Sequence, residues 1–213
     1  MPKKLIIFAS GSKNGGGSGF ENLVLATEDG RLNAKIIGVV SNHQNGGVRE
    51  KADRLKIPFI YFAGPWTAEE YQRITAKADF VALSGWLKLV TGLDPRTTFN
   101  IHPGPLPRFG GPGMYGHHVH EAVMDAYAKG ELTQSAVTIH FVTEQYDEGP
   151  EAFKAPVPIF YGDKVEDLAA RVNKAEHLYQ PIVTNLILEG KIHWDGKDPK
   201  SIVTIPLDDI DLA

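Results

Sequence analysis

The 213-residue sequence contains no cysteine. This excludes disulfide frameworks, thiolate nucleophiles and cysteine-ligated zinc, and it is typical of proteins in a reducing compartment. We therefore expect a cytoplasmic protein whose chemistry depends on oxygen and nitrogen groups.

The sequence also lacks an excess of positive charge and a long apolar run at its start. The sequence has 22 basic and 26 acidic residues, so its formal net charge is -4. No positive field over the whole molecule attracts nucleic acid or an anionic membrane, and an anionic ligand needs a local site. The apolar run after Lys3 and Lys4 is too short for the core of a signal peptide. We expect small-molecule substrates, no nucleic-acid or membrane partner, and either a monomer or a homodimer.

Short apolar runs alternate with stretches of helical spacing in the first part of the chain. The expected strands cover residues 5–9, 36–40, 59–62 and 80–83. One helix is expected to start near Phe20, and two more to cover residues 48–55 and 67–78. This alternation requires right-handed crossovers and a mainly parallel sheet. Strands that are apolar on both faces indicate helices on both sides. The sequence predicts a single-domain, Rossmann-like α/β fold with a twisted sheet.

The later part of the chain continues this pattern with a long irregular stretch inside it. The expected elements are a strand at 98–102, a glycine- and proline-rich loop at 104–113, a helix at 117–129, strands at 136–142 and 152–159, and a helix at 165–188. Neither a repeat nor a linker indicates a second domain. We expect residues 1–194 to form one domain, with residues 195–213 as a polar tail that packs on it or belongs to it.

Asn100 and His102 stand two residues apart at the end of an expected strand. Side chains at this spacing share a face of the sheet, and open α/β sheets bind ligands at this end of their strands. An amide donor and an imidazole therefore lie side by side at a candidate catalytic centre. Taken alone, Asn-x-His-Pro also fits a hydrogen-bonded core histidine beside a turn residue.

Asp147 lies in a second turn at a strand end. A carboxylate brought beside His102 would raise its pKa and favour an imidazolium that stabilises an oxyanion. It could also accept the proton that an attacking amine loses. The alternative is an Asx-turn that supports Gly149 and Pro150.

A glycine-rich stretch at residues 10–19 connects the first expected strand to a helix. Backbone amides at such a loop can hold a phosphate against the positive end of the helix dipole. The stretch fits neither G-x-G-x-x-G nor the Walker pattern, which disfavours a dinucleotide or ATP site. A flexible loop without a ligand remains the alternative.

Three histidines, His117, His118 and His120, invite a metal interpretation. Their spacing to Glu121 and Asp125 matches no common metalloenzyme motif. We expect no metal and interpret these histidines as surface or substrate-lining residues, His120 being the candidate for the second role.

The segment 100–109 resembles the signature of folate-dependent formyltransferases. Further pieces resemble the family in the same order, at residues 85–89, 138–143, 147–150 and 175–177, so that the likeness runs from the first strand to about Trp194. The resemblance implies direct transfer of the formyl group of 10-formyltetrahydrofolate to the amine of glycinamide ribonucleotide. Alternatives are transfer to another amine, hydrolysis of the formyl folate, and a noncatalytic nucleotide- or folate-binding module. The other amine would be that of a sugar nucleotide or of initiator methionyl-tRNA; enzymes acting on the tRNA are expected to carry an additional C-terminal domain, and the hydrolases an added N-terminal regulatory domain.

The resemblance also implies roles for individual residues. Asn100 and protonated His102 would stabilise the oxyanion, while Asp147 holds His102 and manages the amine proton. The implied substrate-binding residues are Gly17, Ser18 and Gly19 for the phosphate, Glu176 for the ribose, and His120. The implied folate-binding residues are Leu87, Lys88, Leu89, Val90 and Glu144. The sequence departs from the family in its longer glycine loop and at Gly19, where the family has asparagine.

Overall fold

The computed structural model describes residues 1–13 and 15–210, so Asn14 of the glycine loop and residues 211–213 of the expected tail lie outside the described residues. Seven described strands form one sheet in the order β3-β2-β1-β4-β5-β6-β7. The strands are β1 (Lys3–Phe8), β2 (Ala34–Ser41), β3 (Phe59–Tyr61), β4 (Phe80–Ser84), β5 (Thr98–His102), β6 (Gln134–Phe141) and β7 (Glu151–Pro158). The five strands from β3 to β5 run parallel, and β6 and β7 continue the sheet antiparallel. The predicted mainly parallel α/β fold is confirmed.

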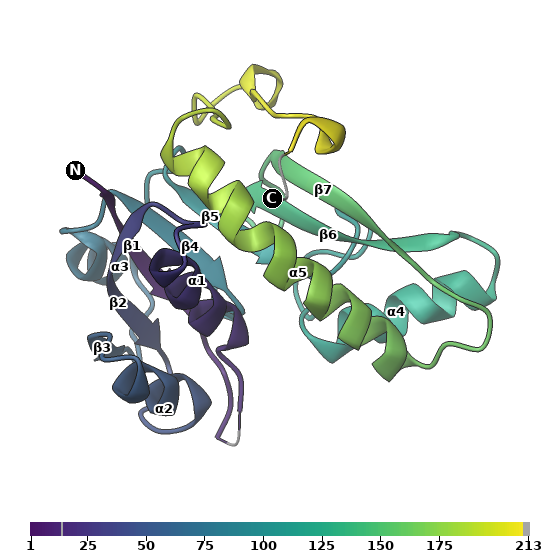
Figure 1. The fold of residues 1–213 in the computed structure, drawn as a ribbon, viewed down its shortest axis with the longest axis horizontal. Coiled ribbons are helices and arrows are strands. Elements are labelled where there is room, and N and C mark those ends of the chain that lie inside the picture. The colour runs from purple at the N-terminus through teal and green to yellow at the C-terminus, as the bar shows by residue number, and fades with distance from the viewer. Residues whose placement is uncertain (14, 211–213) are drawn as a thin grey trace.

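Five helices connect and cover these strands. They are α1 (Ser18–Glu28), α2 (Gly47–Arg54), α3 (Ala68–Thr75), α4 (His117–Ala128) and α5 (Val165–Leu188). In Figure 1, α5 crosses the sheet beside α1, and the two helices contact each other. Among the described residues, no helix has both the length and the apolar character needed to cross a membrane.

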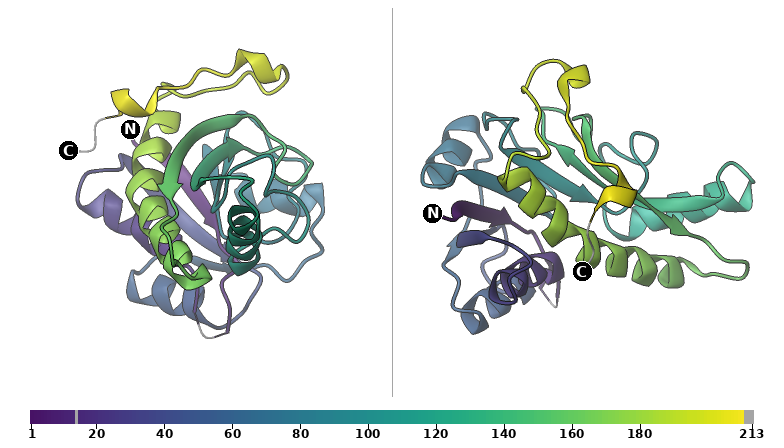
Figure 2. Two further views of the ribbon diagram at one scale, coloured as in Figure 1. Left: turned by 90° about the vertical axis from the view of Figure 1, so that its right-hand side faces the viewer. Right: turned by 45° about the horizontal axis from the view of Figure 1, so that its top comes forward.

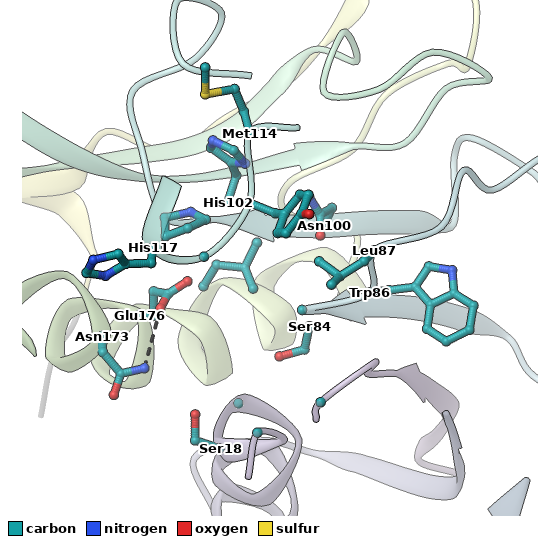
Figure 3. A pocket seen from close by; sticks show the side chains of 18 of the residues that line it. Ser18, Ser84, Trp86, Leu87, Asn100, His102, Met114, His117, Asn173 and Glu176 are labelled. Atoms are coloured by element: carbon teal, nitrogen blue, oxygen red, sulfur yellow. Dashed lines mark hydrogen bonds between the residues drawn. The ribbon is translucent and has the colours of Figure 1, made fainter. Parts of the chain in front are cut away.

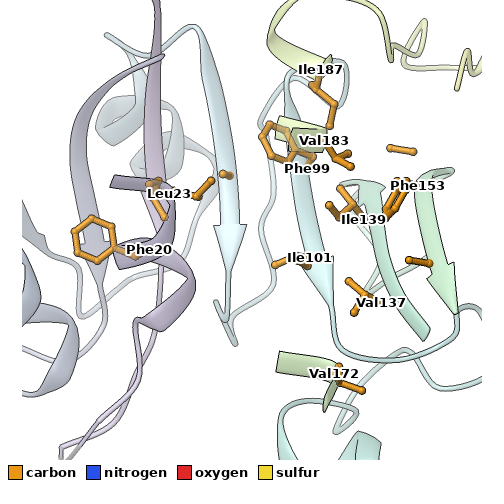
Figure 4. Packing of buried hydrophobic residues seen from close by; sticks show 14 of the residues in the cluster. Phe20, Leu23, Phe99, Ile101, Val137, Ile139, Phe153, Val172, Val183 and Ile187 are labelled. Atoms are coloured by element: carbon orange, nitrogen blue, oxygen red, sulfur yellow. The ribbon is translucent and has the colours of Figure 1, made fainter. Parts of the chain in front are cut away.

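Strand β1 shows why both faces of the sheet need a cover. Leu5 and Ile7 belong to the larger apolar cluster, which also holds residues of α1 and α5, whereas Ile6 and Phe8 belong to a smaller cluster with Tyr71 of α3. Alternate side chains of one strand are thus buried on opposite sides. Figure 4 shows the larger cluster, where helix and strand side chains meet.

The chain after α5 folds back toward the sheet. His193 pairs with Val203, and the short 3₁₀ helix Leu207–Asp209 contacts β7. Ile210 is buried against the larger cluster. This segment is the yellow trace beside the end of α5 in Figure 2. The boundary at residue 194 stays a prediction.

Candidate active site

A cavity of about 650 Å³ opens at the carboxyl ends of β1, β4 and β5. Its walls come from the glycine loop, the loop before α4, the turn after β6 and one side of α5. Ligands of open α/β sheets occupy this position because neighbouring connections diverge there. Figure 3 shows Asn100 and His102 on one side of it and Ser18 on the other.

Asn100 is held by a histidine on the neighbouring strand. The antiparallel register of β5 and β6 places His140 opposite Asn100, and Asn100 Nδ2 lies 3.0 Å from His140 Nε2. His140 Nδ1 lies 2.9 Å from the Phe141 carbonyl oxygen, which can only accept. The proton of a neutral His140 therefore sits on Nδ1, and Nε2 accepts from Asn100. This leaves the second N–H of the amide for Asp147, whose Oδ1 is 3.5 Å away, or for a ligand.

His102 is 3% exposed and donates from Nε2 to the Phe109 carbonyl oxygen at 2.7 Å. Its Nδ1 lies 3.8 Å from Asp147 Oδ2. Burial lowers the pKa of His102 more than the charge of Asp147 and the Phe109 carbonyl raise it. Asp147 raises the pKa of His102 as expected, but the expected net rise is wrong, because the cost of desolvating the imidazolium exceeds the attraction of the carboxylate at this distance.

Asp147 stands in a turn with a left-handed backbone, at φ 55°. Its Oδ2 accepts from the Gly111 amide at 3.0 Å, and its Oδ1 lies 3.4 Å from His140 Nε2. Burial would raise the pKa of Asp147, but its contacts with the His140 and His102 imidazoles and with the Gly111 amide together lower it. The carboxylate is therefore ionised beside two buried imidazoles.

The glycine loop forms the opposite end of the cavity. Ser12 and Gly15 pair through their backbones. Gly16 and Gly17 have φ of 88° and 76°, backbone conformations that residues with a side chain rarely adopt. Helix α1 then begins at Ser18, and Gly17, Ser18 and Gly19 all line the cavity. The first amides of α1 have no side-chain cap, so they are available to an anion.

The remaining predicted substrate residues line the same cavity from two helices. Glu176 of α5 lies 3.5 Å from Asn173 Nδ2, and burial raises its pKa to about 7. His120 of α4 is 6% exposed, and burial, helped by His117 and His102, lowers its pKa to about 4. Its Nδ1 has no partner.

His117 also lines the cavity, and both His117 and His118 have exposed side chains near Glu121. Within the described residues, no group of three or more histidine, aspartate or glutamate side chains is arranged to hold a metal.

The five predicted folate residues divide between two cavities. Leu87 lines the main cavity, whereas Val90 and Glu144 line a second cavity of about 260 Å³. Lys88 and Leu89 line neither: Lys88 Nζ lies 4.5 Å from the centre of the Trp66 ring, and the Leu89 carbonyl accepts from Tyr71. The segment thus passes from one cavity to the other instead of lining a single pocket.

Sequence reasoning missed three polar residues of this site. His140 holds Asn100, and Ser84 and Gln180 line the cavity between the glycine loop and Asn100. The segment 138–143 was a usable signal for His140, but its pairing with Asn100 depends on the antiparallel register. Ser84 and Gln180 are 96 positions apart and meet only in the folded chain.

Fold and site together define an α/β protein with an amide, an imidazole and a carboxylate at one end of a cavity and a glycine loop at the other. A model of the formyl transferase family matches residues 3–184, and the chain belongs to this family.

Relatives cover most of the chain. The chloroplastic phosphoribosylglycinamide formyltransferases of Arabidopsis thaliana and Vigna unguiculata are each 36% identical to it, over 90% of this chain and 68% and 63% of their own lengths. The phosphoribosylglycinamide formyltransferase of Haemophilus influenzae is 28% identical, over 93% of this chain and 97% of its own. The crystal structure of glycinamide ribonucleotide transformylase 1 from Symbiobacterium toebii superposes with a TM-score of 0.77 at 30% identity, over 92% of each chain.

Proposed function

We propose that this chain transfers the formyl group of 10-formyltetrahydrofolate to the amine of glycinamide ribonucleotide, a step of purine biosynthesis. The observation that carries the proposal is the two-ended cavity: Asn100, His102 and Asp147 meet at one end, and the glycine loop forms the other. A phosphorylated amine spans such a cavity with its phosphate on the loop and its amine at the catalytic centre. The names of the relatives support the same reaction.

The acceptor is held by its phosphate and its sugar. The free amides at the start of α1, at Ser18 and Gly19, face the phosphate together with Gly17. Glu176 projects from α5 into the cavity and accepts from the ribose hydroxyls, and His120 lines the wall beside the catalytic centre.

The donor approaches from the side of Leu87. The second cavity, with Val90 and Glu144 in its walls, has room for a pterin ring, while Leu87 faces the reacting carbon. Backbone groups near residue 144 then form hydrogen bonds with the edge of the ring. Lys88 and Leu89 hold the segment 87–90 in place through their contacts with Trp66 and Tyr71.

Chemistry begins when the substrate amine attacks the formyl carbon. The carbonyl oxygen becomes an oxyanion, which is stabilised by the imidazole of His102 and by the second N–H of Asn100, in place of its long contact with Asp147. The developing negative charge raises the pKa of His102, so its imidazole takes up a proton from solvent at Nδ1 as the oxyanion forms and returns it when the tetrahedral intermediate collapses. Asp147 accepts the proton of the amine, through water, and the proton is returned to the folate nitrogen as the carbon–nitrogen bond to the folate breaks. The products are the formylated amine and tetrahydrofolate.

A spectrophotometric assay of folate deformylation, run with and without glycinamide ribonucleotide, tests the proposal. An absorbance change that requires the ribonucleotide supports formyl transfer to this acceptor. A change without the ribonucleotide would indicate a hydrolase. The absence of any change would favour another amine or a binding role and would overturn the proposal.

A further inference from the structure

Ser84 occupies the floor of the cavity, between the parts that the proposed function uses. It is the last residue of β4, is 8% exposed and lines the cavity. Strand β4 lies between β1, which leads into the glycine loop, and β5, which carries Asn100. In Figure 3, Ser84 appears between Ser18 and Asn100. A ligand that spans the cavity passes over this hydroxyl.

Gln180 fixes this hydroxyl from the side of α5. Its Nε2 donates to Ser84 Oγ at 3.0 Å, and Gln180 is only 2% exposed. Because Ser84 Oγ accepts this bond, its own proton is free to be donated elsewhere. Gln180 Oε1 is buried and has no hydrogen-bond partner, which costs free energy.

Gly19 makes room for this pair. A Cβ at position 19 would overlap Ser84 Oγ and would lie 3.0 Å from Gln180 Oε1. Gly19 is helical and its φ lies outside the left-handed region, so its backbone does not require glycine. The family has asparagine at this position, and the glycine here has a steric reason: Ser84 and Gln180 occupy the space that a side chain at position 19 would fill.

From these contacts we propose that Ser84 is a further substrate-binding residue, whose hydroxyl donates a hydrogen bond to an oxygen of the sugar phosphate of the acceptor. Gln180 is its positioning residue, and Gly19 is the residue whose lack of a side chain makes room for both. The inference rests on the proposed function because it assumes that a phosphorylated sugar lies between the glycine loop and Asn100.

Binding of ribose 5-phosphate, measured by isothermal titration calorimetry, tests the contact without amine, folate or turnover. Ser84→Ala should weaken binding about tenfold, the usual size of a lost hydrogen bond to a charged or strongly polar oxygen. In steady-state assays the KM for glycinamide ribonucleotide should rise by a similar factor, with kcat and the KM for the folate unchanged. Thr184→Val is the matched control, because Thr184 is buried one turn further along α5 without a partner and does not line the cavity.

Two combined variants separate the contact from packing. Gly19→Ala should lower Tm, and adding Ser84→Ala should restore Tm while leaving affinity for ribose 5-phosphate low. Gln180→Leu should weaken binding in the native background and have no further effect beside Ser84→Ala. Circular dichroism establishes folding, and Ser84→Cys provides a second variant that keeps the volume and weakens the donor.

Unchanged affinity in folded Ser84→Ala and Ser84→Cys would overturn the binding role, even in an enzyme that transfers formyl groups. Additive effects of Gln180→Leu and Ser84→Ala would overturn the positioning role. If the native protein binds ribose 5-phosphate through Ser84 but transfers no formyl group, the proposed function fails and the contact stands. If the native protein does not bind ribose 5-phosphate, the contact fails, whatever the deformylation assay shows.

Discussion

The polar residues of the candidate catalytic centre hold one another through hydrogen bonds and close contacts between the carboxylate and the imidazoles. His140 accepts from Asn100, Asp147 lies against both histidines, and His102 is tied to the Phe109 carbonyl. A buried network of this kind fixes side-chain directions before a substrate arrives, so that little reorganisation is needed in the transition state.

Removing any member of the centre should therefore affect the reaction much more than the fold. We expect Asn100→Ala, His102→Ala and Asp147→Asn each to lower kcat by about 100-fold or more, the usual effect of losing an oxyanion donor or its partner. Glu148→Gln, a change of the exposed carboxylate beside Asp147, should leave kcat unchanged. Steady-state kinetics on variants with native circular dichroism provides the measurement, and near-normal rates in all three would remove the catalytic assignment.

Glu176 should make the stability of the ligand-free protein depend on pH. Its folded pKa of about 7 lies above the ordinary value of 4.5, so the folded state binds the proton more tightly than the unfolded state. The free energy of unfolding should then fall as the pH rises from 4.5 to 7 and change no further from this group above 7. Glu176→Gln should remove this loss and be more stable at pH 8 by on the order of 1–3 kcal/mol. Urea unfolding at pH 5 and pH 8 checks this, with Glu148→Gln as control; equal stability of the Gln variant and the native protein at pH 8 would contradict it.

At the scale of elements, the turn between β6 and β7 positions Asp147. The pairing of these strands shifts register between Ile139 and His140, and Gly149 follows two residues after Asp147. A Cβ on Gly149 would overlap the Phe141 carbonyl oxygen. Irregular pairing next to a candidate active site is a common way to direct a side chain.

We expect Gly149→Ala to push this turn away from β6 and to lower both Tm and kcat, since Asp147 moves with the turn. Gly130→Ala is a matched control: Gly130 has φ 71°, open space around its Cβ position and a place at the end of α4, away from the cavity. The control should lower Tm through backbone strain of about 1 kcal/mol and leave kcat unchanged. Native kcat in a folded Gly149→Ala would show that the turn does not position Asp147.

The elements were predictable from the sequence because apolar runs and glycine or proline punctuation agree along the chain. The expected strand at residues 98–102 and the helix at 165–188 coincide with β5 and α5. The pairing of Asn100 with His140 was not predictable, since it depends on the antiparallel continuation of the sheet.

The electrostatics of the site were also beyond the sequence. The direction of the pKa shift of His102 depends on how deeply the ring is buried, and the sequence gives only the presence of Asp147. Similarly, residues 87–90 are consecutive, yet the path of the backbone places Leu87 in the main cavity and Val90 in the second cavity. The two residues between them line neither cavity.

At the scale of the whole molecule, the residues proposed to bind the acceptor and to catalyse the reaction meet at the carboxyl ends of the central strands. The parallel half contributes the glycine loop after β1 and Ser84 at the end of β4. Strand β5 carries Asn100 and His102, and the antiparallel half contributes His140 and Asp147. Helix α5 crosses both halves (Figure 1), and its residues Glu176 and Gln180 line the same cavity. The net charge of -4 leaves recognition of an anionic substrate to these local groups.

The most direct test of this account follows the formyl carbon itself. Native protein and His102→Ala are given a 10-formyl folate labelled with ¹³C in the formyl group, together with glycinamide ribonucleotide, and the products are examined by mass spectrometry. The account predicts that the native protein moves the label onto the ribonucleotide amine and that His102→Ala does so at least about 100-fold more slowly. Label released as free formate by the native protein, or equal transfer by the two proteins, would contradict it.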